Sequence, residues 1–207
     1  MKKDIVVFLI SLLLLTTFPT TFAQEKNEEL NIEINNLKGI SYRKTDQGFF
    51  EFFKVQVWTR LLDNANIKEG ETLKTAPDSI LTLNLGSNNI VELKEKSILK
   101  IAESISTQVQ NLSVQKGKVI INSNINPEQE FNIEVTTPNS IINGTHVLLN
   151  VEVNKYRTLI SVQQGEVTLT EKTTLQEINL IQGQLAIVEN NEIKKYDPVA
   201  MNENQNS

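Results

Sequence analysis

The chain has 207 residues, of which 20 are Lys or Arg, 25 are Asp or Glu, one is His and none is Cys. The lack of cysteine excludes disulfides, a lipid-modified N-terminal Cys and a Cys nucleophile, and a lone His without Cys cannot complete a structural zinc site. A formal charge of −5 with scattered basic residues argues against a nucleic-acid partner, because phosphate contacts need clustered Lys and Arg. The sequence has no EF-hand loop, Gly-rich phosphate loop or G-x-S-x-G elbow, so it predicts no catalytic, cofactor-binding or metal-binding residue.

The N-terminus has the pattern of a secretory signal peptide. Lys2 and Lys3 precede an apolar run at residues 5–15, and Thr21-Phe22-Ala23 places small residues at the two key positions of a cleavage site. The run is shorter than the roughly 20 residues of a bilayer-spanning helix. We therefore predict a signal peptide at residues 1–23, a periplasmic or secreted location, and no membrane span in the mature chain. Cleavage leaves 18 basic and 24 acidic residues, a formal charge of −6.

The rest of the chain is predicted to be all-β. Residues 24–38 are a polar lead-in with an expected edge strand at 32–37. From residue 39 to residue 196, short apolar runs alternate with turn residues about every 8 to 12 positions, which is typical of an all-β domain. We expect stacked short hairpins that form a β-solenoid-like or sandwich domain. The polar residues 197–207 are predicted to be a disordered tail.

An aromatic segment lies early in this domain. Four of the five Phe residues after the predicted cleavage site fall between Phe49 and Phe53. Phe50, Phe52 and Trp58 share one strand parity, and Phe53 lies on the other. Burial on both faces is the simpler interpretation, because aromatic side chains dominate cores. The alternative is an exposed patch in which Phe50, Phe52 and Trp58 bind a partner.

The stretch from residue 135 to residue 169 carries the clearest strand pattern. Alternate positions 147–153 hold Val, Leu, Val and Val, which predicts one buried face. The only histidine, His146, falls on the opposite face and is expected to be solvent-facing or hydrogen-bonded, not catalytic. Pro138, Gly144 and Thr145 are predicted to form turns, with a positive φ at Gly144 and a Thr145 hydroxyl bonded to nearby backbone. A ligand-contact loop at residues 143–145 is the alternative.

Two segments of the chain echo one another. SVQKGKVII at residues 113–121 and SVQQGEVTL at residues 161–169 agree at five of nine positions, and a looser copy surrounds Gly183. A Gly between two apolar runs fits a hairpin turn with positive φ, so Gly165 and Gly183 are predicted turn glycines. Repetition of such a unit is expected of stacked hairpins or a short solenoid. A chance match within β-rich sequence is the alternative.

In their order and spacing these motifs resemble the FecR domain family. Val135-Thr-Thr-Pro138, then Asn143-Gly144-Thr145 and an alternating strand, resembles its "TP…V.GT.F.V" run. Trp58 with the runs after it resembles the family's opening, and the glycines at 165 and 183 resemble its later steps. The resemblance covers residues 39–188. Two departures are Val147, where an aromatic is usual, and Ser87-Asn88-Asn89, where the family has an Asp-Gly-Ser turn.

The resemblance implies an all-β module of the bacterial cell envelope. The namesake protein lies in the periplasm and relays a signal from an outer-membrane transporter to a sigma factor. The sequence is expected to lack the anti-sigma segment and transmembrane helix that this relay uses. The resemblance therefore implies a stand-alone exported protein, a non-enzymatic binding or regulatory module in envelope signalling, whose partner is a protein or a cell-envelope polysaccharide. The alternative is a carbohydrate- or cell-wall-binding structural module.

Overall fold

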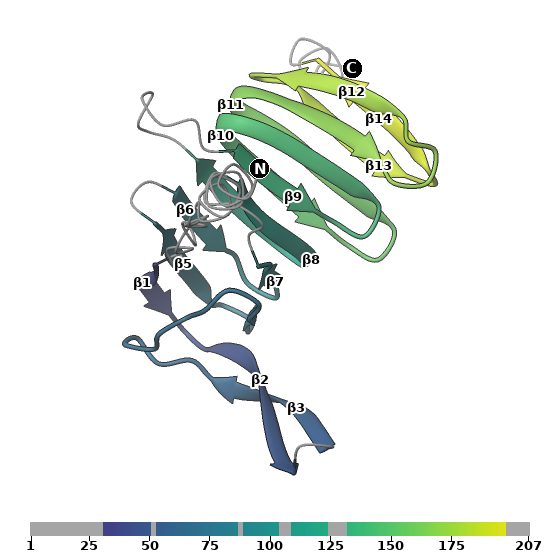
Figure 1. Cartoon of the computed structure of the whole chain (residues 1–207). Coiled ribbons are helices and arrows are strands. Elements are labelled where there is room, and N and C mark those ends of the chain that lie inside the picture. The colour runs from purple at the N-terminus through teal and green to yellow at the C-terminus, as the bar shows by residue number, and fades with distance from the viewer. Residues whose placement is uncertain (1–30, 51–52, 87–88, 104–108, 124–131, 198–207) are drawn as a thin grey trace, which may run out of the picture.

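The computed structural model describes residues 31–50, 53–86, 89–103, 109–123 and 132–197, without the side chains of residues 45–50 and 53–56. The described chain is an all-β structure, as predicted (Figure 1). Its strands are β1 (Ile32–Lys38), β2 (Ser41–Phe50), β3 (Phe53–Arg60), β4 (Thr72–Thr75), β5 (Ile80–Leu85), β6 (Asn89–Leu93), β7 (Ile98–Ile101), β8 (Val109–Ser123), β9 (Asn132–Thr136), β10 (Ser140–Val153), β11 (Arg157–Glu171), β12 (Glu177–Ile181), β13 (Leu185–Glu189) and β14 (Glu192–Tyr196).

The strands pair into one sheet that is folded into two layers. The first layer runs β3-β2-β4-β7-β8-β9-β10-β11-β12, and the second runs β1-β5-β6-β8-β10-β11-β13-β14. All the described pairings are antiparallel except that between β8 and β9. The long strands β8, β10 and β11 appear in both orders because each contributes one half to each layer. A single hydrophobic cluster includes buried side chains from both layers.

Each long strand changes the parity of its buried residues where it passes between layers. In β11, Thr158, Ile160 and Val162 are buried before the corner, and Val167 and Leu169 are buried after it. The pattern of buried and exposed positions in β8 matches that of β11 at every position after the first. The extra residue at the corner keeps apolar side chains on the inside of both layers, as in other orthogonal sheet packings. The sequence echo is therefore a structural repeat.

The glycines of the repeat form corners in continuous strands, so the prediction of hairpin turns there is wrong. Gly117 has φ 83° and Gly165 has φ 85°, as the positive-φ prediction requires. A Cβ on Gly165 would lie 2.7 Å from the backbone oxygen of His146. Both the backbone conformation and the close approach of a neighbouring strand thus require glycine.

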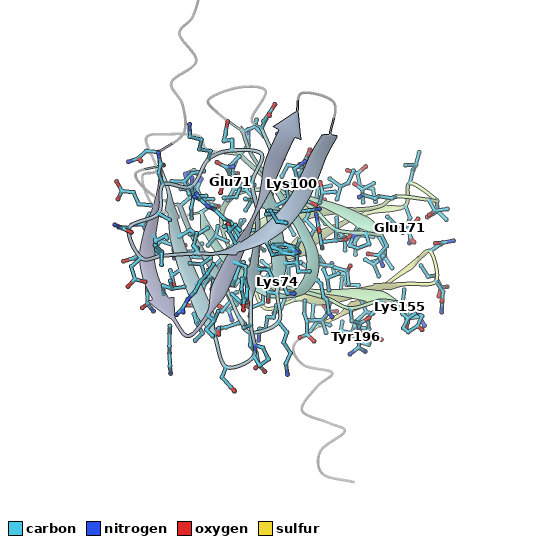
Figure 2. The ribbon with its side chains drawn as sticks, turned by 90° about the horizontal axis from the view of Figure 1, so that it is seen from below. Glu71, Lys74, Lys100, Lys155, Glu171 and Tyr196 are labelled. Atoms are coloured by element: carbon cyan, nitrogen blue, oxygen red, sulfur yellow. The ribbon has the colours of Figure 1, made fainter. Side chains whose placement is uncertain are left out.

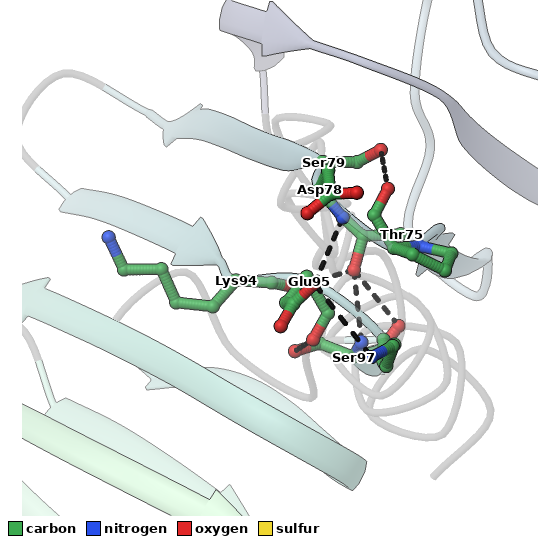
Figure 3. A network of polar contacts seen from close by, with 8 residues as sticks. Thr75, Asp78, Ser79, Lys94, Glu95 and Ser97 are labelled. Carbon is green, nitrogen blue, oxygen red and sulfur yellow. Dashed lines mark hydrogen bonds and ion pairs between the residues drawn. The ribbon is translucent and has the colours of Figure 1, made fainter.

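The corner of β8 is tied to the turns beside it by hydrogen bonds of Ser97 and Thr75. Ser97 Oγ accepts from Lys118 N at 3.0 Å and donates to Lys118 O at 3.0 Å. Ser97 N donates to Thr75 Oγ1 at 3.0 Å, and Thr75 Oγ1 donates to Lys94 O at 2.6 Å (Figure 3). A Cβ on Gly117 would lie 2.5 Å from Ser97 Cα. Buried hydroxyls therefore satisfy the backbone groups that the bend leaves without ladder partners.

The expected edge strand at residues 32–37 is confirmed, and it belongs to the sheet. β1 pairs with β5 from Ile32↔Leu85 to Lys38↔Ile80. Ile32 is buried and also forms a bridge with Ile67. The folded unit therefore includes part of the segment that sequence patterning assigned to the polar lead-in. The predicted signal peptide and most of the predicted tail lie outside the described residues.

Candidate functional site

Thr137, next to the signature proline, lies at a buried junction between strands. Its Oγ1 accepts hydrogen bonds from Ser140 N at 3.0 Å and from Thr158 Oγ1 at 3.1 Å. Asn139 Nδ2 donates to Val188 O at 2.9 Å. These bonds join the β9–β10 turn to β11 and β13, while Pro138 is exposed at the turn. The Thr-Pro part of the motif therefore holds the layers together and offers no reactive group to solvent.

Gly144 and Thr145 do not have the backbone conformation and the hydrogen bond that the sequence predicted for them. Gly144 does not have a positive φ; the left-handed residue of this corner is His146, with φ 52°. A Cβ on Gly144 would lie 2.8 Å from Val167 Cγ1, so glycine is required by the close packing of β11. Thr145 is exposed, and its hydroxyl makes no hydrogen bond to any described residue. Gly183 has φ 84° and donates its N–H to Val162 O at 2.8 Å, as expected of a turn glycine.

His146 is half-buried, and its imidazole Nε2 is enclosed. Within the described residues no group hydrogen-bonds to Nε2, which differs from the expectation of a solvent-facing or hydrogen-bonded ring. No described group of three or more His, Cys, Asp or Glu side chains is arranged to hold a metal ion. In the part of the chain that the structure covers, no helix has the length and hydrophobicity to cross a membrane.

Among the described residues, three titratable groups have shifted pKa values, and each has a structural partner. Hydrogen bonds from Thr174 N and Thr173 N lower the pKa of the buried Glu171 carboxyl, with N–O distances of 2.5 and 2.8 Å. Burial lowers the pKa of Lys172, which donates to Thr137 O at 2.5 Å. Burial also raises the pKa of Glu71, although the Arg43 guanidinium lies 3.7 Å away. These groups stabilise turns and strand ends.

The most distinctive surface is formed by the β2–β3 hairpin, which projects from the layered body (Figure 1). Its base is anchored by Leu61 N donating to Ser41 O at 2.8 Å and by the fully buried Leu61 side chain. Trp58, on β3, keeps 40% of its surface exposed. Lys74 Nζ, from β4, lies 5.6 Å from the centroid of the indole ring. Lys74 lies opposite Tyr42 of the hairpin, and Lys100 lies one strand farther away, on β7 (both are labelled in Figure 2).

Of the three predicted partner-binding residues, only Trp58 has a side chain that the structure describes. Trp58 is exposed, which favours the exposed-patch interpretation at that position. Phe50 ends β2, with its backbone opposite Phe53, but its side chain lies outside the described atoms. Phe52 lies outside the described residues. Sequence reasoning missed Lys74 and Lys100, because only the strand register places Lys74 beside Trp58 and Lys100 on the same face two strands beyond Lys44.

The family comparison explains why the corner motifs resemble a known pattern. The FecR protein family matches residues 71–168, which run from the start of β4 into β11. These residues form a FecR domain. The β2–β3 hairpin precedes the matched FecR segment, and β12 to β14 follow it. The match is shorter than the resemblance over residues 39–188 and does not include Trp58.

Solved structures share the fold of this chain. Two crystal structures of a proposed anti-sigma factor from Parabacteroides distasonis ATCC 8503, at 1.65 and 2.50 Å resolution, each superpose with a TM-score of 0.52 at 15% sequence identity. Each superposition covers 61% of this chain and 59% of that protein. The chain therefore matches less than two thirds of that protein, and the likeness is one of fold. No curated protein matches the chain.

Proposed function

We propose that this protein is an exported, non-enzymatic binding module that regulates envelope signalling. The FecR domain at residues 71–168 is the observation that carries the proposal. The shared fold with a proposed anti-sigma factor supports a regulatory role. The predicted signal peptide supports action in the periplasm or outside the cell. In this proposal the domain recognises a partner through its surface and transmits that contact without covalent chemistry.

The β2–β3 hairpin is the proposed contact surface. Within the described residues β3 pairs only with β2, so its outer backbone groups can receive an added strand. Trp58 is partly exposed beside that edge, and tryptophan is enriched among the residues that dominate binding energy at interfaces. Phe50, whose backbone ends β2, and Phe52, which lies outside the described residues, are the other two residues proposed for this contact.

The test compares gene expression in a wild-type strain, a deletion strain and complemented strains. We expect deletion to change transcription of a defined group of promoters that depend on one alternative sigma factor. Complementation with the wild-type chain should restore their expression, whereas Trp58→Ala should not, because the variant loses the proposed anchor. RNA sequencing provides the measurement, and immunoblotting checks that each variant accumulates in the envelope fraction.

Tyr156→Ala is the matched control for Trp58→Ala. Tyr156 is 70% exposed and has Lys155 Nζ 5.3 Å from its ring centroid, so it reproduces the exposed aromatic–lysine pair away from the hairpin. This variant should restore expression fully. Unchanged transcription in the deletion strain would contradict the signalling role, and equal restoration by both variants would contradict the role of the hairpin.

A further inference from the structure

The strand register collects basic and aromatic side chains on the outward face of the first layer. Lys44 lies opposite Trp58 on β3 and opposite Thr72 on β4, and Thr72 in turn lies opposite Lys100 on β7. The neighbouring row is Arg60, Tyr42 and Lys74. The intervening residues Leu73 and Leu99 are fully buried, so these two rows point away from the core. We call the following set the cationic face: Tyr42, Lys44, Trp58, Arg60, Lys74 and Lys100.

The cations of this face have no acidic partner among the described side chains. Across the described side chains, no carboxylate forms an ion pair with Lys44, Arg60, Lys74 or Lys100. Glu71, next to Thr72 in sequence, pairs with Arg43, and the side chain of Asp46, two residues after Lys44 on β2, lies outside the described atoms. The whole chain nevertheless has a formal charge of −5. Four unpaired positive charges on adjacent strands repel one another, and a bound polyanion relieves that repulsion.

Trp58 adds a flat apolar contact to this charged surface. The Lys74 ammonium over one side of the indole leaves the ring partly exposed among the cations. A large rigid aromatic offers contact area at a small cost in conformational entropy. A sugar ring can stack its C–H groups on such a surface while its carboxylate reaches a neighbouring Lys or Arg.

The same outward face continues across the layer as a polar surface that also carries the carboxylates of Glu134 on β9 and Glu177 on β12. Lys100 lies opposite Ser113, and Ser113 lies opposite Thr136. Farther along, Asn143 lies opposite Glu134 on β9 and opposite Thr168 on β11, so this part of the face is both polar and acidic. Hydroxyl and amide groups of this kind suit the alternating donors and acceptors of a polyol chain. The nine strands of the first layer span about 38 Å at a spacing of about 4.8 Å, which is long enough for several sugar units.

We infer that the cationic face binds an anionic polysaccharide bearing carboxylate groups. The lysines and Arg60 pair with the carboxylates, Trp58 stacks on a sugar ring, and the hydroxyls of Ser113 and Thr136, next to Lys100, bond the sugar hydroxyls. This inference shares the hairpin with the proposed function but requires no sigma factor. It concerns a direct ligand, so it is tested with purified protein and not by gene expression.

The experiment measures binding of the purified mature chain to three polymers by calorimetry at low salt. Polygalacturonate supplies a carboxylate on every sugar, its methyl ester supplies the same chain without charge, and poly-L-glutamate supplies the charge without the sugar. We expect binding to polygalacturonate, weaker binding to the other two, and loss of affinity as salt rises because the contacts are ionic.

Variants of the cationic face test the residues. The double variant Lys74→Gln, Lys100→Gln should weaken polygalacturonate binding by about tenfold or more, and Trp58→Ala should weaken it by a similar factor. The control double variant Lys155→Gln, Lys194→Gln removes the same charge from the β10–β11 turn and from β14, away from the β2–β3 hairpin, and should bind as the wild type does (Figure 1). Melting temperatures verify that each variant is folded.

Three outcomes would overturn the inference. If the methyl ester bound as tightly as polygalacturonate, ligand charge would not matter for binding. If both double variants lost the same affinity, the cationic face would not be the binding site. Binding of poly-L-glutamate as tight as that of polygalacturonate, with no effect of Trp58→Ala, would instead identify an acidic protein segment as the ligand. If no polymer binds while gene deletion still alters the sigma-dependent promoters, the inference fails and the proposed function stands.

Discussion

Glycine serves two separable purposes in this chain. At Gly70 the backbone is left-handed, with φ 85°, but a Cβ would meet nothing closer than Glu103 Oε1 at 3.5 Å. At Gly144 the backbone is not left-handed, and the limit is the distance to Val167. At Gly165 both constraints act together. Alanine substitutions at the three positions therefore distinguish backbone strain from lack of space.

We expect the three alanine variants to rank in stability by the constraints that they violate. Gly70→Ala should lower the free energy of unfolding by about 1 kcal/mol, because alanine is strained at this positive φ although there is space for its Cβ. Gly144→Ala should cost about 1–3 kcal/mol, since Val167 has to shift. Gly165→Ala should cost more than either, because the neighbouring backbone oxygen cannot move aside. Denaturant unfolding gives the values, and a Gly165→Ala variant as stable as Gly70→Ala would contradict the corner geometry.

At the scale of elements, a buried carboxylate fixes the turn between β11 and β12. Glu171 is fully buried, and its Oε2 accepts from Thr173 N, Thr174 N and Thr174 Oγ1. Its own N–H donates to Gln176 O at 2.9 Å. The carboxylate thus satisfies backbone donors at the point where the chain leaves a long strand. Its charged form is required for this role.

The sign of the Glu171 pKa shift predicts a loss of stability in acid. Because the pKa of Glu171 is lower in the folded protein than in the unfolded chain, its contribution to stability is present above the unfolded pKa and is lost as the pH falls through the folded pKa. The difference in melting temperature between the wild type and Glu171→Gln should therefore shrink on acidification. Melting curves recorded from pH 7 downward provide the measurement.

Glu71 provides a control of opposite sign. Burial raises its pKa in the folded protein, so its protonated form favours folding below the unfolded pKa and this contribution is lost as the pH rises through the folded pKa. The wild type should gain stability relative to Glu71→Gln as the pH falls. If both glutamine variants responded to pH in the same direction, the assignment of the two carboxylates would be wrong.

At the scale of the whole molecule, two layers share one core through three strands that turn corners. Val151 and Ile142 both belong to β10, yet they face the core from different layers. The layers therefore cannot separate without disrupting the middle of β8, β10 and β11. This connection favours a single cooperative unfolding transition.

Hydrogen exchange tests that cooperativity. The amides on either side of the corners in β8, β10 and β11 should exchange at similar slow rates, because both halves are released in the same global opening. The edge strands β3 and β14 should exchange faster, since each has one described neighbour. Rates that differ by more than about tenfold between the two halves of these long strands would indicate layers that unfold separately.

The sequence by itself determined the strand content, the repeat and the FecR resemblance. These depend on local patterns: the alternation at residues 147–153, the match between residues 113–121 and 161–169, and the motif around Pro138. Only the tertiary structure decided that Gly117 and Gly165 are corners and not hairpin turns, since that depends on which strands pair with each half. The tertiary structure also gives the reason for glycine at position 144, because the side chain that leaves no space for a Cβ there belongs to Val167, which is distant in sequence. Sequence patterns could not predict the cationic face for the same reason, since only the register of four strands places Lys44, Lys74 and Lys100 on one face with Trp58.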